Sequence, residues 1–125
     1  MSEPALSIDT PEFRATTAID GARMIVAMHG DGTVAVVPAL YELFVGVHER
    51  CREKAIAEVC VDLKGVEFLN SSCFNVLVNW IRSIRLLDQG CQYHIRFIPD
   101  EKSHWQKTSL RVLATFGKSL VAIDE

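Results

Sequence analysis

The stretch that decides the fold runs from residue 58 to residue 80. It reads Glu58-Val59-Cys60-Val61-Asp62-Leu63-Lys64-Gly65-Val66-Glu67-Phe68-Leu69-Asn70-Ser71-Ser72-Cys73-Phe74-Asn75-Val76-Leu77-Val78-Asn79-Trp80. The apolar start predicts a short strand through Leu63, followed by a brief connection over residues 64–69. The Asn-Ser-Ser step then predicts the start of an amphipathic helix, with two serine hydroxyls at its N-terminus. Because unpaired N–H groups and the positive end of the helix dipole meet there, this point accommodates negative charge.

Size and composition narrow the class of protein. A chain of 125 residues is long enough for one domain with a single core. Its formal net charge of −3 argues against a nucleic-acid partner. No apolar run approaches the roughly 18 residues needed to span a bilayer, so we expect no membrane insertion. The start, Met1-Ser2-Glu3-Pro4, lacks the basic and apolar regions of a signal peptide, which predicts a cytoplasmic protein.

Upstream of the central stretch, the pattern predicts two strands and a helix. Residues 1–10 are expected to be a loose lead-in, and residues 11–125 the folded domain. Strands over residues 12–19 and 23–28 are joined by a turn at Asp20-Gly21, and Gly30-Asp31-Gly32 is expected to end the second strand. Pro38 suits the first turn of a helix whose apolar residues recur at helical spacing as far as Cys51.

Downstream, two helices alternate with two strands. The helix that begins near Ser72 is expected to reach a C-cap at Gly90, and a strand over residues 91–98 follows. A weaker helical pattern from Trp105 to Phe116 stops at Gly117, before a short strand over residues 119–123. The predicted order is β-β-α-β-α-β-α-β. It indicates one α/β domain, a mixed sheet of about five strands with three main helices packed on it.

Three passages resemble the STAS domain family, which includes the anti-sigma factor antagonists, and the resemblance covers nearly the whole chain. Residues 30–40 are similar to the family's Gly-x-Leu-Asp stretch and the Pro-x-Leu that follows it, with Thr33 in place of the Asp. Residues 61–69 are similar to its third strand. Residues 70–77 stand where the family has Asp-Ser-Ser-Gly-Leu-Gly-Val-Leu, with Asn70, Cys73 and Asn75 replacing the Asp and the two glycines.

The resemblance implies phosphorylation at the start of this helix. In anti-sigma factor antagonists the second serine of the motif is phosphorylated, which corresponds to Ser72. A related group of STAS-like phosphoproteins of biofilm signalling has Asn-Thr-Ser-Ser here. Its acceptor directly follows the Asn, which corresponds to Ser71. The resemblance therefore implies Ser72 or Ser71 as the acceptor, unless the chain is a binder that has lost the switch.

The function expected from this resemblance is that of a bacterial signalling protein acting on transcription by protein–protein binding. Its partner would be a serine kinase of the anti-sigma-factor type or a related regulatory ATPase, with a phosphatase to reset the switch. The alternative is a constitutive STAS adaptor or scaffold subunit, in a signalling assembly or an ABC-type lipid transport complex. A simpler interpretation of Asn70 or Ser71 is a helix cap worth about 1 kcal/mol.

The expected partner-binding residues lie at the start of this helix and along one stripe of it. We expect Trp80 to pack in or at the edge of the core. The four cysteines are expected to be buried thiols, with Cys73 the one whose pKa a helix N-terminus could lower. The full set of expected partner-binding residues is Asn70, Ser71, Ser72, Cys73, Asn75, Asn79 and Arg82.

An enzymatic function has little support in the sequence. A triad of Ser71 or Ser72 with His94 or His104 and Asp62 lacks a Gly-x-Ser-x-Gly elbow. The four histidines have no metal-ligand spacing, and no glycine-rich phosphate loop is present. We therefore expect no catalysis, no metal and no cofactor, and nothing positive indicates a small-ligand or nucleotide sensor.

Overall fold

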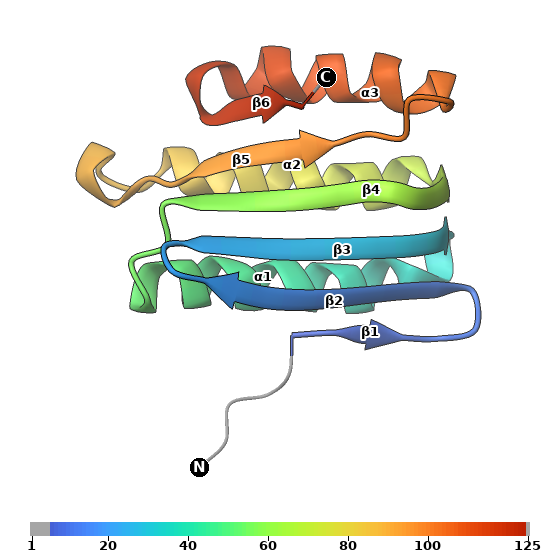
Figure 1. Ribbon diagram of the computed structural model, residues 1–125, viewed down its shortest axis with the longest axis horizontal. Helices are drawn as coiled ribbons and strands as arrows, with labels where there is room; N and C mark the ends of the chain where they lie inside the picture. The colour runs from blue at the N-terminus through green and yellow to red at the C-terminus, as the bar shows by residue number, and fades with distance from the viewer. Residues whose placement is uncertain (1–5, 125) are drawn as a thin grey trace.

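A computed structural model describes residues 6–124 and places six strands in one mixed sheet, in sequential order from β1 to β6 (Figure 1). The first three strands pair antiparallel, and β3 to β6 pair parallel. The strands are β1 (Ile8–Asp9), β2 (Phe13–Asp20), β3 (Arg23–Gly32), β4 (Glu58–Leu69), β5 (His94–Ile98) and β6 (Val121–Ile123).

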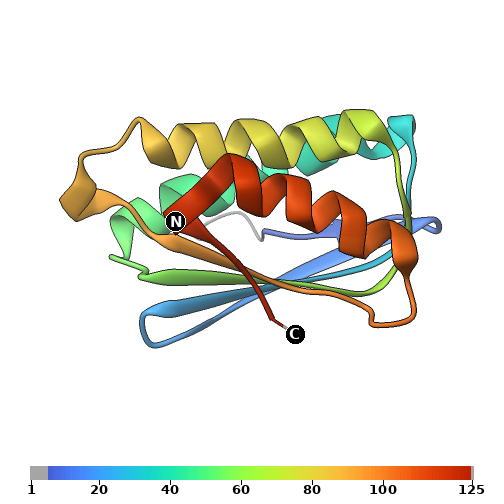
Figure 2. The same cartoon turned by 90° about the horizontal axis from the view of Figure 1, so that it is seen from above.

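Three helices connect the parallel strands and lie on the same side of the sheet. They are α1 (Val37–Glu53), α2 (Ser71–Arg85) and α3 (His104–Gly117), with short 3₁₀ turns at Val34–Val36, Gln89–Cys91 and Lys118–Leu120. Crossover connections between parallel strands are right-handed, so strands that follow one another in sequence order place every helix on one face. Figure 2 shows this arrangement, with the opposite face of the sheet free of helices.

The predicted mixed sheet with three helices is confirmed, but the strand count of about five is too low. The additional strand is β1, which pairs with β2 through Ile8 opposite Ala15. Ile8 is only 6% exposed, because its side chain joins the core. The predicted loose lead-in over residues 1–10 is therefore wrong at Ile8 and Asp9. Its residues 1–5 lie outside the described part of the chain.

Two strands are longer than the sequence predicted. Gly30-Asp31-Gly32 was expected to end a strand, yet β3 continues through it with a register shift. Gly30 makes this possible with φ of +100°, and the Asp31 N–H donates to the Glu12 carbonyl at 2.8 Å. Residues 64–69, expected to form a connection, belong to β4 and pair with β3 as far as Leu69.

The helix that begins at the Asn-Ser-Ser step is confirmed at its start and shorter than predicted at its end. It ends at Arg85 rather than near Gly90, which lies in a 3₁₀ turn. Ile84 is the last buried residue of α2, and one more turn would bring Asp88 onto the same face. The strands expected over residues 91–98 and 119–123 begin later, at His94 and Val121.

The core lies between the sheet and the helix layer, and Trp80 belongs to it as predicted. Trp80 is 3% exposed, and its indole Nε1–H donates to the Tyr93 hydroxyl at 2.9 Å. The Tyr93 hydroxyl also lies 2.6 Å from Nδ1 of His48 on α1. This chain of contacts joins α1, α2 and the residue before β5, and so holds α2, which carries the two serines, against α1.

Candidate functional site

The start of α2 is capped by Asn70. Its Oδ1 accepts a hydrogen bond from the Ser72 N–H at 2.8 Å, and its carbonyl accepts one from the Phe74 N–H at 3.0 Å. The prediction that Asn70 is a cap is confirmed. Ser71 is exposed in the first turn, whereas Ser72 is partly buried. No acidic residue lies in this turn, so the positive end of the helix dipole has no carboxylate beside it on α2.

Two segments distant in sequence meet at this helix start. The Asn70 N–H donates to the Gly32 carbonyl at 2.7 Å, which joins the end of β3 to the junction between β4 and α2. The thiol of Cys73 lies 3.5 Å from the Gly32 carbonyl and 3.3 Å from the Thr33 carbonyl. As a result, the backbone that carries the two serines is held against the loop that leads into α1.

Cys73 is a structural residue, which corrects its assignment to the partner-binding set. Its side chain is fully buried, so no partner can contact it. Burial raises the pKa of its thiol, although the backbone at Asn70 acts in the opposite direction. The helix N-terminus therefore does not produce a reactive thiolate here. The thiol instead fills the space between α2 and the Gly32-Thr33 backbone.

An exposed surface surrounds the two serines and includes residues that sequence reasoning missed. Phe68 is 49% exposed and Val34 is 65% exposed, and neither was among the predicted binding residues. Phe68 pairs in register with Asp31, which places both beside the helix start. We call this area the α2-start surface, and its exposed residues are Asp31, Val34, Phe68, Ser71 and Asn75.

The expected stripe along α2 is present beyond this surface. Asn75, Asn79 and Arg82 are all exposed, and the Arg82 guanidinium donates to Asn79 Oδ1 at 3.4 Å. The structure thus brings together every predicted partner-binding residue except the buried Cys73. Asp31, Val34 and Phe68 of the α2-start surface were not among the predicted binding residues.

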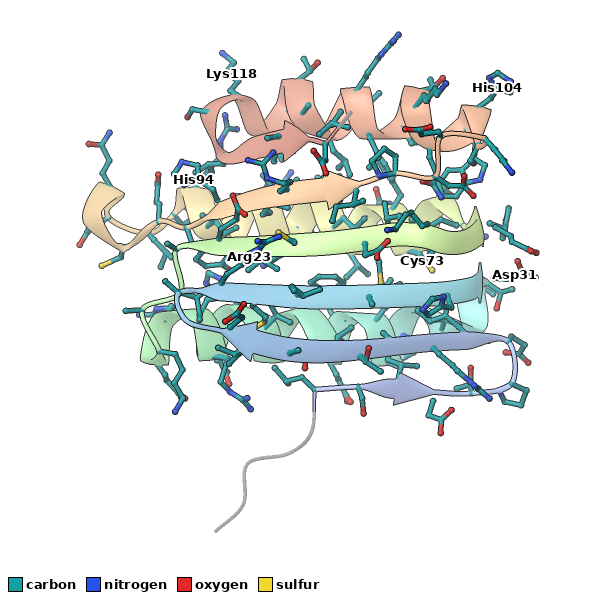
Figure 3. The ribbon with its side chains drawn as sticks, in the orientation of Figure 1. Arg23, Asp31, Cys73, His94, His104 and Lys118 are labelled. Carbon is teal, nitrogen blue, oxygen red and sulfur yellow. The ribbon has the colours of Figure 1, made fainter. Side chains whose placement is uncertain are left out.

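A hydrolytic triad that uses His94 does not come together. Asp62 accepts a hydrogen bond from the Lys64 N–H at 3.0 Å, and its other carboxylate oxygen lies 3.7 Å from Lys64 Nζ. His94 pairs with Glu58 at the opposite end of β4 from the serines, and Figure 3 shows it far from Cys73 and Asp31. Over residues 6–124, no hydrogen bond joins either serine to a histidine.

The remaining cysteines and acidic groups give no metal site within the described chain. No group of three or more His, Cys, Asp or Glu residues among residues 6–124 could hold a metal ion. Cys51 and Cys60 are buried as predicted, and burial raises the pKa of the Cys51 thiol to about 12. Cys91 is exposed, which corrects the expectation that all four thiols are buried.

Solved structures share this arrangement. A crystal structure of an anti-sigma factor antagonist from Mycobacterium paratuberculosis superimposes with a TM-score of 0.64, at 16% sequence identity, over 92% of this chain and 90% of that one. The anti-sigma factor antagonist SpoIIAA, in its unphosphorylated form, gives a TM-score of 0.61 at 10% identity, over 89% of this chain and 87% of that one. The chain therefore has the STAS fold of anti-sigma factor antagonists.

Sequence comparison adds no further assignment. Neither a protein-family model nor a curated protein sequence matches this chain. In the described part of the chain, none of the helices combines the length and apolar character needed to cross a membrane.

Proposed function

We propose that this protein regulates a partner protein by binding it through the α2-start surface, and that phosphorylation of Ser71 or Ser72 switches this binding. The observation that carries the proposal is the position of the two serines. They stand in the first turn of a capped helix, beside exposed Phe68 and Val34. The partner proposed is a regulatory ATP-binding kinase of the anti-sigma-factor type.

The α2-start surface combines features that suit a switched interface. Phe68 and Val34 offer apolar area of the kind that forms the desolvated centre of a protein interface. Ser71 is open to solvent, so a kinase could reach its hydroxyl without unfolding the helix. Asn70 supplies the cap through its own side chain, so the helix start does not depend on either serine hydroxyl.

A phosphate at this point would change the partner's binding more than the fold of this chain. It would add a charge of about −1.5 to −2 next to the positive end of the α2 dipole, where negative charge is tolerated. In a complex, the same charge would have to be desolvated beside Phe68 and Val34. A loss of about 3 kcal/mol would weaken binding roughly a hundredfold, since about 1.4 kcal/mol corresponds to a factor of ten.

The test uses a serine kinase of the anti-sigma-factor type from this protein's own cells, with binding measured by calorimetry. Ser71→Asp and Ser72→Asp are compared with Ser71→Ala and Ser72→Ala. The proposal expects Asp at one position to abolish binding while Ala there preserves it. A constitutive adaptor would tolerate Asp at both positions. Equal losses with Ala and Asp would assign the serine to packing, and either result would overturn the switch.

A further inference from the structure

The helix layer has an uneven distribution of charge. Residues 71–87, which include α2, and residues 102–123, which include α3, contain six Lys or Arg residues and no Asp or Glu. The whole chain has 13 Lys and Arg against 16 Asp and Glu, so the other residues have seven cations against sixteen acids. By sequence, residues 71–87 and 102–123 therefore carry a net charge of +6, and the rest of the chain carries a net charge of −9.

Two of these cations are held over an aromatic ring where α2 meets α3. The guanidinium carbons of Arg82 and Arg85 lie 5.9 and 5.4 Å from the centre of the Phe116 ring. Neither arginine forms an ion pair within the described residues, in contrast to Arg14, Arg23 and Arg96. The ring positions both positive groups by cation–π attraction without neutralising them.

Exposed apolar side chains occur next to Arg85 in sequence and one turn from Phe116 on α3. Leu86 at the end of α2 is 83% exposed, and Val112, one turn before Phe116 on α3, is 55% exposed. A partner at this place would therefore meet apolar area and two cations that form no ion pair within the described residues, with the exposed Asp88 as the next acidic residue along the chain. We call this area the α2–α3 basic face, and its residues are Arg82, Arg85, Leu86, Val112 and Phe116.

We propose that the α2–α3 basic face binds an acidic amphipathic helix of a partner protein. Carboxylates of that helix would pair with Arg82 and Arg85, and its apolar side chains would cover Val112 and Phe116. This inference goes beyond the phosphorylation switch and does not require it. Arg85 and Phe116 lie at the far end of α2 from the serines.

The negative charge outside this face favours a compact protein segment as its ligand, rather than an extended polyanion. A membrane surface or a nucleic-acid duplex presents negative charge to the whole molecule, including the part with net charge −9. A single helix can contact the basic face alone. The field of the protein would orient such a helix as it approaches, and salt would weaken that attraction.

The test is a titration of the isotope-labelled full chain with a synthetic helical peptide of about five turns, followed by backbone NMR shifts. The probe peptide has leucines on one face and glutamates along its flanks, and a control peptide has glutamines in place of the glutamates. We expect saturable shifts on the basic face with the glutamate peptide only. Raising the salt to about 0.5 M should weaken binding at least about tenfold.

Two variants with the same change in net charge locate the site. Arg82→Glu/Arg85→Glu should lose binding of the glutamate peptide, whereas Arg14→Glu/Lys54→Glu, on β2 and just after α1, should retain it. Unchanged binding in the first variant, shifts elsewhere or no binding would overturn the inference. So would stronger binding to anionic phospholipid vesicles, or concentration-dependent shifts of the free protein at this face, which would assign it to a membrane or a second copy. Neither variant alters Ser71 or Ser72. Because Arg82 also belongs to the stripe expected to bind the partner, the single variant Arg85→Glu separates this face from the switch.

Discussion

The side-chain oxygen of Asn70 accepts a hydrogen bond from the Ser72 N–H at 2.8 Å. Asn70 therefore caps the helix, and the serine hydroxyls stay available for phosphorylation. In the described chain neither the Ser71 nor the Ser72 hydroxyl takes part in the cap, because the amide oxygen of Asn70 performs that role. A carboxylate at position 70 would place a negative charge beside a phosphoserine. The neutral amide gives the same hydrogen bond without that repulsion.

Removal of this cap should destabilise the protein modestly. Asn70→Ala is expected to lower the free energy of unfolding by about 1 kcal/mol, since the Ser72 N–H loses its acceptor. Asn70→Asp should keep the cap and raise the free energy of unfolding, because its negative charge interacts favourably with the positive end of the helix dipole. Urea denaturation followed by far-UV circular dichroism measures both variants. An Ala variant as stable as the wild type would show that the Asn70 side chain contributes nothing at this helix start.

The buried Gln106 should be far more sensitive than its polar side chain suggests. Its Nε2 donates to the carbonyls of Leu63 and Val66, both at 2.9 Å, and its Oε1 accepts the Asp100 N–H at 2.8 Å. Gln106→Leu leaves three backbone groups without these partners, so we expect a loss of at least about 2 kcal/mol in unfolding free energy. The exposed Gln89→Leu is the matched control and should change stability little. Similar results for the two variants would contradict this role of Gln106.

Two glycines with positive φ should respond differently to alanine. A Cβ at Gly30 would lie on the Glu12 carbonyl, while a Cβ at Gly21 would meet open space. Gly21→Ala should therefore cost only backbone strain, about 1 kcal/mol, and Gly30→Ala should cost more because the strands must also separate. Thermal unfolding of both variants measures the difference. A smaller loss at Gly30 than at Gly21 would show that β3 bends there for another reason.

The contact between His48 and Tyr93 predicts a loss of stability in mild acid. Trp80 donates to the Tyr93 hydroxyl, whose own proton then goes to His48 Nδ1, and this requires a neutral imidazole. Burial, followed by the charge of Arg52, lowers the pKa of His48 below 6.5, although Glu49 acts in the opposite direction. In the unfolded chain His48 takes up its proton at higher pH than in the folded one. The stability that neutral His48 contributes to the free energy of unfolding is therefore complete above about pH 6.5. It is lost as the pH falls through the lowered pKa of the folded state.

The measurement is the unfolding free energy from pH 7.5 to pH 5 for the wild type and for His48→Gln. The wild type should lose more stability across this range than the variant, because only the wild type has the group whose proton uptake differs between the two states. Parallel curves for the two proteins would contradict the account.

Much of the fold follows from local patterns, and the differences have physical reasons. The capped start of α2 was predictable because Asn70 directly precedes the apolar period of that helix. The continuation of β3 was not, because Gly30 normally marks a break and here permits a bulge. Gln106 gave no signal either, since its three hydrogen-bond partners come from β4 and the loop before α3.

The candidate site was also predictable in part, because local sequence patterns place several of its residues on one helix. Ser71, Ser72 and Asn75 follow from position on one helix. The exposure of Phe68 and Val34 depends on where two separate segments meet, which no local pattern contains. Cys73 was wrongly placed in the binding set, because helical spacing alone did not show that the Gly32-Thr33 backbone covers it.

The central claim is that a serine at the start of α2 carries a phosphate in the cell. The most direct measurement is phosphopeptide mass spectrometry on the protein isolated from its own cells during growth and under stress. Cleavage after Lys64 and Arg82 places both serines on one peptide, residues 65–82, where fragmentation assigns the site. We predict a phosphate on Ser71 or Ser72 in a fraction of the molecules that changes between the two conditions. An unmodified peptide at full coverage under both conditions would contradict the switch and favour a constitutive adaptor.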